Sequence, residues 1–232
     1  MNPILSIIDF DRAITLSLNG SNSLFWDNLM SVCTNTFAWT LLIIMLLYII
    51  FKNNTVRDAF IILITIGLMI FIADRICSGW IKPVVGRWRP TQDPLYMYSV
   101  DVVNDYRGGR FGFFSGHACN STCMAMFLSW IFRYKKLTIV LFIWAAFATF
   151  TRIYLGVHYI GDITVGAIAG CLIGYLFYKL YDKLYGHAIH NHRVSEQYTK
   201  SGYQKSDLER FLSVIFLNYI FLIIFSITIG IK

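Results

Sequence analysis

Charged residues are scarce in this sequence. Only 14% of its 232 residues are Asp, Glu, Lys or Arg, whereas a soluble domain usually carries about 25%. Hydrophobic residues make up 56% of the chain, and the mean hydropathy is +0.57. The charges that remain gather in the connections and leave long apolar runs between them. This composition excludes an ordinary soluble domain and indicates an integral membrane protein.

The sequence also lacks any CxxC pair. Its 5 cysteines are odd in number and fall mostly in or beside the apolar runs, so we expect free thiols packed among apolar side chains, with neither a disulfide framework nor a zinc site. The N-terminus lacks the basic region of a secretory signal peptide, and Asp9 and Asp11 interrupt its short apolar stretch. We therefore expect no cleaved leader.

Six segments are apolar enough, and about long enough, to cross the hydrocarbon core of a bilayer, which takes roughly 20 residues. The third is the weakest, because polar side chains crowd its start and would need a wet, protein-lined environment. Before the first segment, isoleucines and a leucine recur at helical spacing between residues 4 and 18. The six segments cover approximately residues 32–51, 57–77, 116–133, 137–155, 160–181 and 210–230.

These segments predict an all-α fold. We expect a six-transmembrane-helix bundle, preceded by a short amphipathic helix that lies on the membrane surface. The bundle forms a single integral membrane domain over residues 1–232. Lys and Arg are more frequent in the connections that follow the first, third and fifth spans, once the cations assigned below to chemistry are left out. This bias places those connections in the cytoplasm and both termini outside.

The net positive charge and the histidines of the inner connection both have simple explanations. The net charge of +7 fits topology signals and contacts with anionic headgroups, so no nucleic-acid partner is expected. The inner connection, residues 182–209, carries His187, His190 and His192. Metal could bind there, but no carboxylate or cysteine completes a ligand set, and a solvated polar loop is favoured.

Three polar stretches fall on the same, outer side of the predicted bundle. They are KPVVGRWRP (82–90), FFSGH (113–117) and TRIYLGVHYIGD (151–162). Because they border different spans and still share one face, their side chains can form one site. Each stretch alone has a simple explanation: cations contacting lipid headgroups, or a structural hydrogen bond. Their occurrence together favours chemistry.

The cations and small residues of these stretches predict an anion site. Lys82, Arg89 and Arg152 supply three positive charges, and the planar fork of Arg matches phosphate oxygens. Ser115 adds a hydroxyl group, and Gly116 lets a backbone N–H approach an anion at the start of a helix. Clustered cations beside a bilayer repel one another unless an anion compensates them, and a phosphoryl group would do so.

Two histidines and a carboxylate could supply the chemistry. His158 and Asp162 have i, i+4 spacing, so on a helix the carboxylate lies beside the imidazole. A carboxylate that accepts one ring N–H leaves the other nitrogen with its lone pair, oriented as a nucleophile or base. His117 comes from another span and could act as the acid.

Together, the three stretches resemble the three-part signature of the type 2 phosphatidic acid phosphatase superfamily. The first part is Lys82 with Arg89-Pro90, the second is Ser115-Gly116-His117, and the third is Arg152 with His158 and Asp162. That family includes bacterial lipid phosphatases, undecaprenyl-diphosphate phosphatases, lipid A phosphatases, glucose-6-phosphatase and vanadium haloperoxidases. The motif region is residues 82–162. Two positions depart from the usual pattern: Phe114 replaces a common Pro, and Thr151 replaces a Ser but keeps the hydroxyl.

The resemblance implies a metal-independent phosphatase that uses no cofactor and acts on a membrane lipid phosphate. His158 would attack phosphorus and form a phosphohistidine, Asp162 would orient it, and His117 would protonate the leaving oxygen. The remaining residues would bind phosphate: Lys82, Arg89, Ser115, Gly116, Arg152 and Thr151. The implied location is the bacterial inner (cytoplasmic) membrane, with the site facing the periplasm or exterior.

Several alternatives stay open at this point. A non-enzymatic lipid-phosphate transporter or binding protein would need the cations but not the histidine–aspartate pair, and a vanadium haloperoxidase would share the pocket on a soluble scaffold. The substrate could be undecaprenyl diphosphate, phosphatidic acid, phosphatidylglycerophosphate or lipid A, and the oligomeric state is not specified.

Residues 91–114 are expected to cover the pocket, with headgroup contacts from its tyrosines and arginines, namely Tyr96, Tyr98, Tyr106, Arg107 and Arg110. Arg107 and Arg110 could equally be solvated loop charges.

Overall fold

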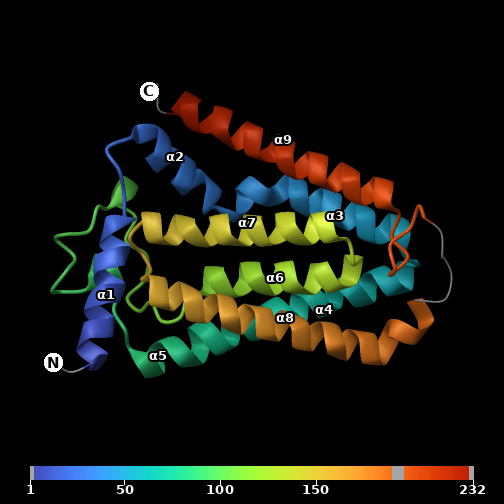
Figure 1. Ribbon diagram of the computed structural model, residues 1–232, viewed down its shortest axis with the longest axis horizontal. Coiled ribbons are helices and arrows are strands. Elements are labelled where there is room, and N and C mark those ends of the chain that lie inside the picture. The colour runs from blue at the N-terminus through green and yellow to red at the C-terminus, as the bar shows by residue number, and fades with distance from the viewer. Residues whose placement is uncertain (1–2, 190–195, 230–232) are drawn as a thin grey trace.

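A computed structural model describes residues 3–189 and 196–229 of the chain. Its long helices lie side by side along the longest axis of the molecule (Figure 1). The part of the chain that the structure describes contains no strand, only two isolated bridges. The long helices are α3 (Thr40–Asn53), α4 (Val56–Asp74), α6 (Gly116–Phe132), α7 (Lys135–Tyr154), α8 (Ile160–Ile189) and α9 (Lys205–Ile229).

Five helical segments within the described ranges are long and apolar enough to cross a membrane. They are Thr36–Asn53, Val56–Val85, Lys135–Tyr154, Ile160–Tyr185 and Lys205–Ile229. The all-α membrane bundle predicted from the sequence is therefore confirmed, although the count of six spanning helices is not. The segment predicted as the third span corresponds to α6, which has only 17 residues.

Helix α6 lies inside the bundle. It packs against α4, α7 and α8, and Figure 1 shows it between α7 and α8. Its polar first turns therefore meet protein rather than lipid. Three glycines of α8 allow the closest of these contacts: a Cβ at Gly166 would lie 2.6 Å from the carbonyl oxygen of Ser115, and one at Gly170 would lie 2.2 Å from that of Cys119. Gly174 continues the same row, as in other membrane helix pairs with small residues at the interface.

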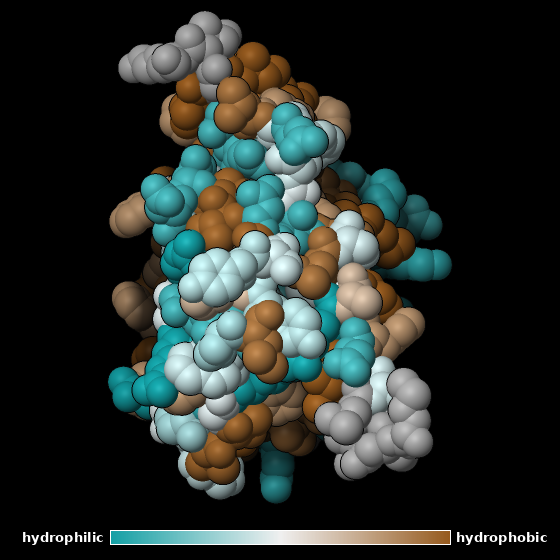
Figure 2. Space-filling view, turned by 90° about the vertical axis from the view of Figure 1, so that its left-hand side faces the viewer, coloured by the Kyte–Doolittle hydropathy of each residue, from teal (hydrophilic) through white to brown (hydrophobic). Residues whose placement is uncertain are grey.

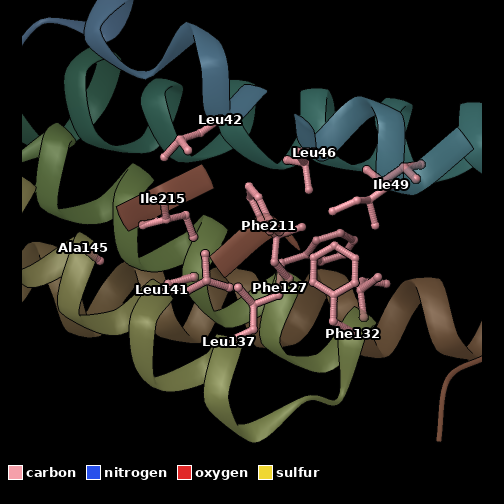
Figure 3. Packing of buried hydrophobic residues seen from close by; sticks show 14 of the residues in the cluster. Leu42, Leu46, Ile49, Phe127, Phe132, Leu137, Leu141, Ala145, Phe211 and Ile215 are labelled. Carbon is pink, nitrogen blue, oxygen red and sulfur yellow. The ribbon is translucent and has the colours of Figure 1, made fainter. Parts of the chain in front are cut away.

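The largest apolar cluster extends along the bundle, from Leu222 of α9 to Phe132 at the C-terminal end of α6. Leu46, Phe127, Phe132 and Phe211, from α3, α6 and α9, point toward one another there (Figure 3). Phe127 and Phe132 are fully buried. This packing fixes the register of the helices, and with it the position of their polar ends.

The opposite end carries the shorter elements. Helix α1 (Pro3–Ser17) crosses the end of the bundle, at the left of Figure 1, and the C-terminal end of α9 reaches the same end. Seen end-on, this face mixes hydrophilic and intermediate residues with scattered apolar ones (Figure 2). The remaining elements are α2 (Leu24–Cys33), η1 (Thr36–Trp39), η2 (Arg75–Ile81), α5 (Lys82–Val85), η3 (Pro90–Gln92) and η4 (Val103–Asp105).

Helix α1 confirms the predicted amphipathic segment and adds an unexpected orientation. Ile7 and Phe10 are 67% and 65% exposed, whereas Thr15 is fully buried and Asp11 partly so. The apolar residues thus point away from the protein, as suits the membrane surface, and polar residues make the contact with the bundle. The side chains of the three histidines at 187, 190 and 192 lie outside the part of the chain that the structure describes.

Candidate active site

The predicted histidine–aspartate pair lies where α7 gives way to α8. His158 is in the short connection, and Asp162 is in the first turn of α8. The Nδ1 atom of His158 is 3.4 Å from Oδ2 of Asp162, and the same oxygen accepts a hydrogen bond from the backbone N–H of Tyr159 (3.1 Å). Both side chains are almost completely buried. Gly112 closes over the pair, because a Cβ at that position would lie 2.8 Å from Oδ2 of Asp162.

The surroundings of His158 keep its imidazole neutral. Burial lowers its pKa well below the ordinary value, and the positive charges of Arg89, Arg152 and Lys82 act in the same direction. A neutral ring that donates Nδ1–H to Asp162 keeps a lone pair on Nε2. This is the protonation state that a nucleophile or base needs at neutral pH.

Arg89 stands directly in front of that lone pair. Its Nη1 atom is 3.4 Å from Nε2 of His158 and donates to the carbonyl of Val157 (3.3 Å). Its Nε atom donates to the carbonyl of Phe111 (3.1 Å). Two backbone carbonyls therefore fix the guanidinium group, which is buried.

Arg152 is the second buried guanidinium group of the site. It lies in the last turn of α7 and is only 3% exposed. It donates from Nη1 to the hydroxyl of Thr34 (2.6 Å) and from Nη2 to the phenol of Tyr106 (2.9 Å). Among the described residues no ion pair joins it to a carboxylate, so it keeps its charge available for an anion.

Helix α6 begins at the same place. Ser115 is its N-cap, with the hydroxyl accepting from the backbone N–H of Ala118 (3.4 Å), and its own N–H donates to the carbonyl of Asp162 (2.9 Å). Nζ of Lys82 would lie 3.9 Å from a Cβ placed on Gly116. The N-terminus of a helix and a lysine therefore face the same small space, an arrangement that favours an anion.

His117 follows in the first turn of α6. Its side chain is exposed, and its ring interacts with the backbone of Thr34 at the end of α2. The charges of His117, Lys82, Arg89 and Arg152 all act on His158, so these five residues from separate stretches of the chain converge.

Not every residue proposed from the sequence faces this space. The hydroxyl of Thr151 donates to the carbonyl of Ala148 within its own helix (2.7 Å). In residues 91–114, the segment predicted to cover the pocket, Tyr106 reaches Arg152, whereas Tyr98 is 88% exposed. The other three residues make contacts with protein: Tyr96 with Arg12, Arg107 with the carbonyl of Thr91, and Arg110 with the rings of Trp88 and Phe111.

Three residues of this region did not emerge from the sequence. Thr34 contacts Arg152, and Arg87 and Asp11 form ion pairs beside Asp162. Arg87 lies two positions before Arg89, but nothing in the pattern separates a structural arginine from a phosphate ligand. In the sequence, Asp11 only interrupts an apolar stretch. No local signal identifies such contacts, because they depend on how distant helices pack.

The arrangement combines an anion pocket with an oriented, neutral imidazole. Two buried arginines, a lysine and a helix N-terminus can bind the oxygens of a phosphoryl group and stabilise the charge that develops during its transfer. Within residues 3–189 and 196–229, no group of three or more His, Cys, Asp or Glu could hold a metal ion.

Comparison with known proteins gives a consistent result. The family model of the PAP2 superfamily matches residues 63–185. The chain is 42% identical to the lipid A 4'-phosphatase of Bacteroides thetaiotaomicron, over 76% of this chain and 79% of the relative. It is 34% identical to the lipid A 4'-phosphatase of Porphyromonas gingivalis, over 75% and 74% of the two chains.

A solved structure supports the fold. The chain superimposes on the crystal structure of a transmembrane PAP2-type phosphatidylglycerolphosphate phosphatase from Bacillus subtilis with a TM-score of 0.58. The match covers 83% of this chain and 90% of that one, at 21% sequence identity.

Proposed function

This chain belongs to the PAP2 superfamily and is a membrane lipid phosphatase, and from that premise we propose that it removes the 4'-phosphate of lipid A, or of a closely similar lipid, through a phosphohistidine. The observation that carries the mechanism is the neutral, buried His158, held by Asp162 and surrounded by Lys82, Arg89 and Arg152. A protein that only bound or transported lipid phosphate would not need this imidazole.

The substrate is proposed from the relatives. The two lipid A 4'-phosphatases match about three quarters of the chain at 42% and 34% identity. Phosphatidylglycerophosphatase B of Bacillus subtilis matches 47% of it at 29% identity. Lipid A is therefore favoured over phosphatidylglycerophosphate.

In the first step, Nε2 of His158 attacks phosphorus while the bond between phosphorus and the leaving oxygen breaks. Asp162 stabilises the imidazolium that forms. Desolvation in the pocket and the charge of Arg152 lower the pKa of His117 to about 4, so His117 first takes up a proton and then gives it to the leaving oxygen. Lys82, Arg89, Arg152, the backbone of Gly116 and the hydroxyl of Ser115 hold the remaining oxygens.

In the second step, water attacks the phosphohistidine. His117, now unprotonated, accepts a proton from this water, and the bond between phosphorus and Nε2 breaks. Inorganic phosphate leaves and His158 is regenerated. The charge is neutralised by side chains throughout, so the cycle requires no metal ion.

Phosphate release from purified protein tests the proposal. We expect the highest kcat/KM on lipid A, with lower values on phosphatidylglycerophosphate, phosphatidic acid and undecaprenyl diphosphate, and activity that persists in EDTA. Mass spectrometry of the product should locate the loss at the 4' position. A preference for another lipid would overturn the substrate assignment, and abolition by chelator with recovery on adding a divalent ion would overturn the metal-independent mechanism.

We also propose that the polar end faces the periplasm or exterior across the bacterial inner membrane, because the connections predicted to carry the excess of Lys and Arg lie at the opposite end. A cysteine at Asp101, exposed at the polar end, should react with an impermeant thiol reagent added from outside. A cysteine at Lys200, exposed at the other end, should not. Four of the five native thiols are buried and contribute little background. The reverse labelling pattern would invert this orientation.

A further inference from the structure

Helix α1 docks on the first turn of α8, where Asp162 lies. The Oδ1 atom of Asp11 accepts a hydrogen bond from the backbone N–H of Gly161 (2.8 Å), and the hydroxyl of Thr15 accepts one from that of Ile160 (3.1 Å). The first N–H groups of a helix have no partner within it. A segment about 150 residues away in the sequence therefore supplies the cap of the catalytic helix.

Arg87 joins this docked helix to Asp162. Its Nη2 atom is 2.5 Å from Oδ2 of Asp11, and its Nη1 atom is 2.7 Å from Oδ1 of Asp162. The guanidinium group lies over the ring of Tyr159, 4.2 Å from the centroid. The planar fork thus connects two carboxylates at once, which the single nitrogen of a lysine does less well.

The two oxygens of Asp162 contact different partners, and this difference shows what Arg87 contributes. Oδ1 is taken by Arg87, while Oδ2 accepts from the backbone of Tyr159 and faces Nδ1 of His158. A carboxylate held at both oxygens cannot rotate away from the imidazole. The ring orientation of His158 therefore depends on Arg87.

Asp11 in turn decides where Arg87 points. The site already contains Lys82, Arg89 and Arg152 for the phosphoryl group. A further arginine with only half of its fork engaged could turn toward the substrate and leave Asp162. With Asp11 on its second nitrogen, Arg87 is compensated by two carboxylates and stays in place.

We propose that Asp11 and Arg87 are positioning residues for phosphoryl transfer. The amphipathic N-terminal helix then contributes to the active site and does not only contact the membrane. This inference rests on the proposed roles of His158 and Asp162. Both residues lie outside the positions through which the chain resembles the family signature, and Asp11 also lies outside the segment matched by the family model.

The test compares Asp11→Asn with Asp9→Asn. Asp9 lies on the same helix, makes one longer ion pair with Arg12 (3.6 Å) and is largely exposed, so its variant has the same charge change without the contact to Arg87. On a soluble phosphate ester in detergent, kcat of Asp11→Asn should fall about 10- to 100-fold with KM nearly unchanged. Asp9→Asn should keep the wild-type kcat.

Two further variants separate positioning from folding. Asp11→Glu keeps the charge and should recover part of the lost kcat. Asp11→Asn combined with Arg87→Gln should be no worse than Arg87→Gln alone, because both act through one contact chain. If Asp11→Asn does not fold, the kcat and KM of Asp11→Glu decide: a lowered kcat at constant KM supports positioning, and wild-type values refute it.

The outcome is distinguishable from failure of the proposed function. If wild-type protein releases no phosphate, or His158→Ala stays active, the proposed mechanism fails first. If the wild type is active, His158→Ala is inactive and Asp11→Asn matches Asp9→Asn, only the role of α1 is overturned.

Discussion

Replacing His158 with alanine is expected to abolish phosphate release, with a loss of at least about 10⁴-fold on every substrate. The reason is that no other group in the site can take over the attack. His117 interacts with the backbone of Thr34, and Lys82, Arg89 and Arg152 are charged. Binding should survive, because the cations that hold the phosphoryl group remain.

The covalent intermediate gives this expectation a direct readout. Rapid quenching of wild-type protein with a ³²P-labelled substrate should leave label on the protein that is stable in base and labile in acid, as a phosphoramidate is. The His158→Ala variant should carry none, while still binding inorganic phosphate through the remaining cations. Turnover by His158→Ala, or label of a different stability, would remove the phosphohistidine from the mechanism.

Replacing His117 with alanine is expected to give a loss that depends on the leaving group. A proton donor matters most when the leaving oxygen is strongly basic, as in an alkyl or sugar phosphate, and least for a nitrophenyl phosphate. General acid catalysis typically contributes about 10²–10⁴-fold. His117→Ala should lose that factor on a lipid phosphate while retaining appreciable activity on the nitrophenyl ester.

The comparison within one variant controls for damage to the pocket. Any change in phosphate binding affects both substrates, whereas a missing proton affects mainly the basic leaving group. A matched His117→Gln variant should behave like alanine, since an amide cannot donate in the same way. Equal losses on the two substrates would contradict the assignment of His117 as the acid.

The membrane bundle could be predicted from the sequence because the bilayer is a solvent that acts on each segment separately. A run such as residues 57–77 must be helical in hydrocarbon, since its backbone groups have no other partners there. The same local reasoning predicts a sixth span at α6, which the count of long apolar helices in the described residues does not confirm. Helix α6 is screened by its neighbours and not by lipid, so its length and polarity do not follow the rule for a lipid-facing helix.

The sequence by itself determined the class of protein and the placement of His158 beside Asp162 at i, i+4, because hydropathy and helical spacing are set by neighbours along the chain. Only the tertiary structure decided which groups orient them. The contacts are Thr34 with Arg152, Asp11 with Arg87, and Arg87 with Asp162, and they join residues separated by 118, 76 and 75 positions. Such contacts arise where packed helices bring their polar ends together in a buried place, and there a charge must find a partner wherever in the chain that partner lies.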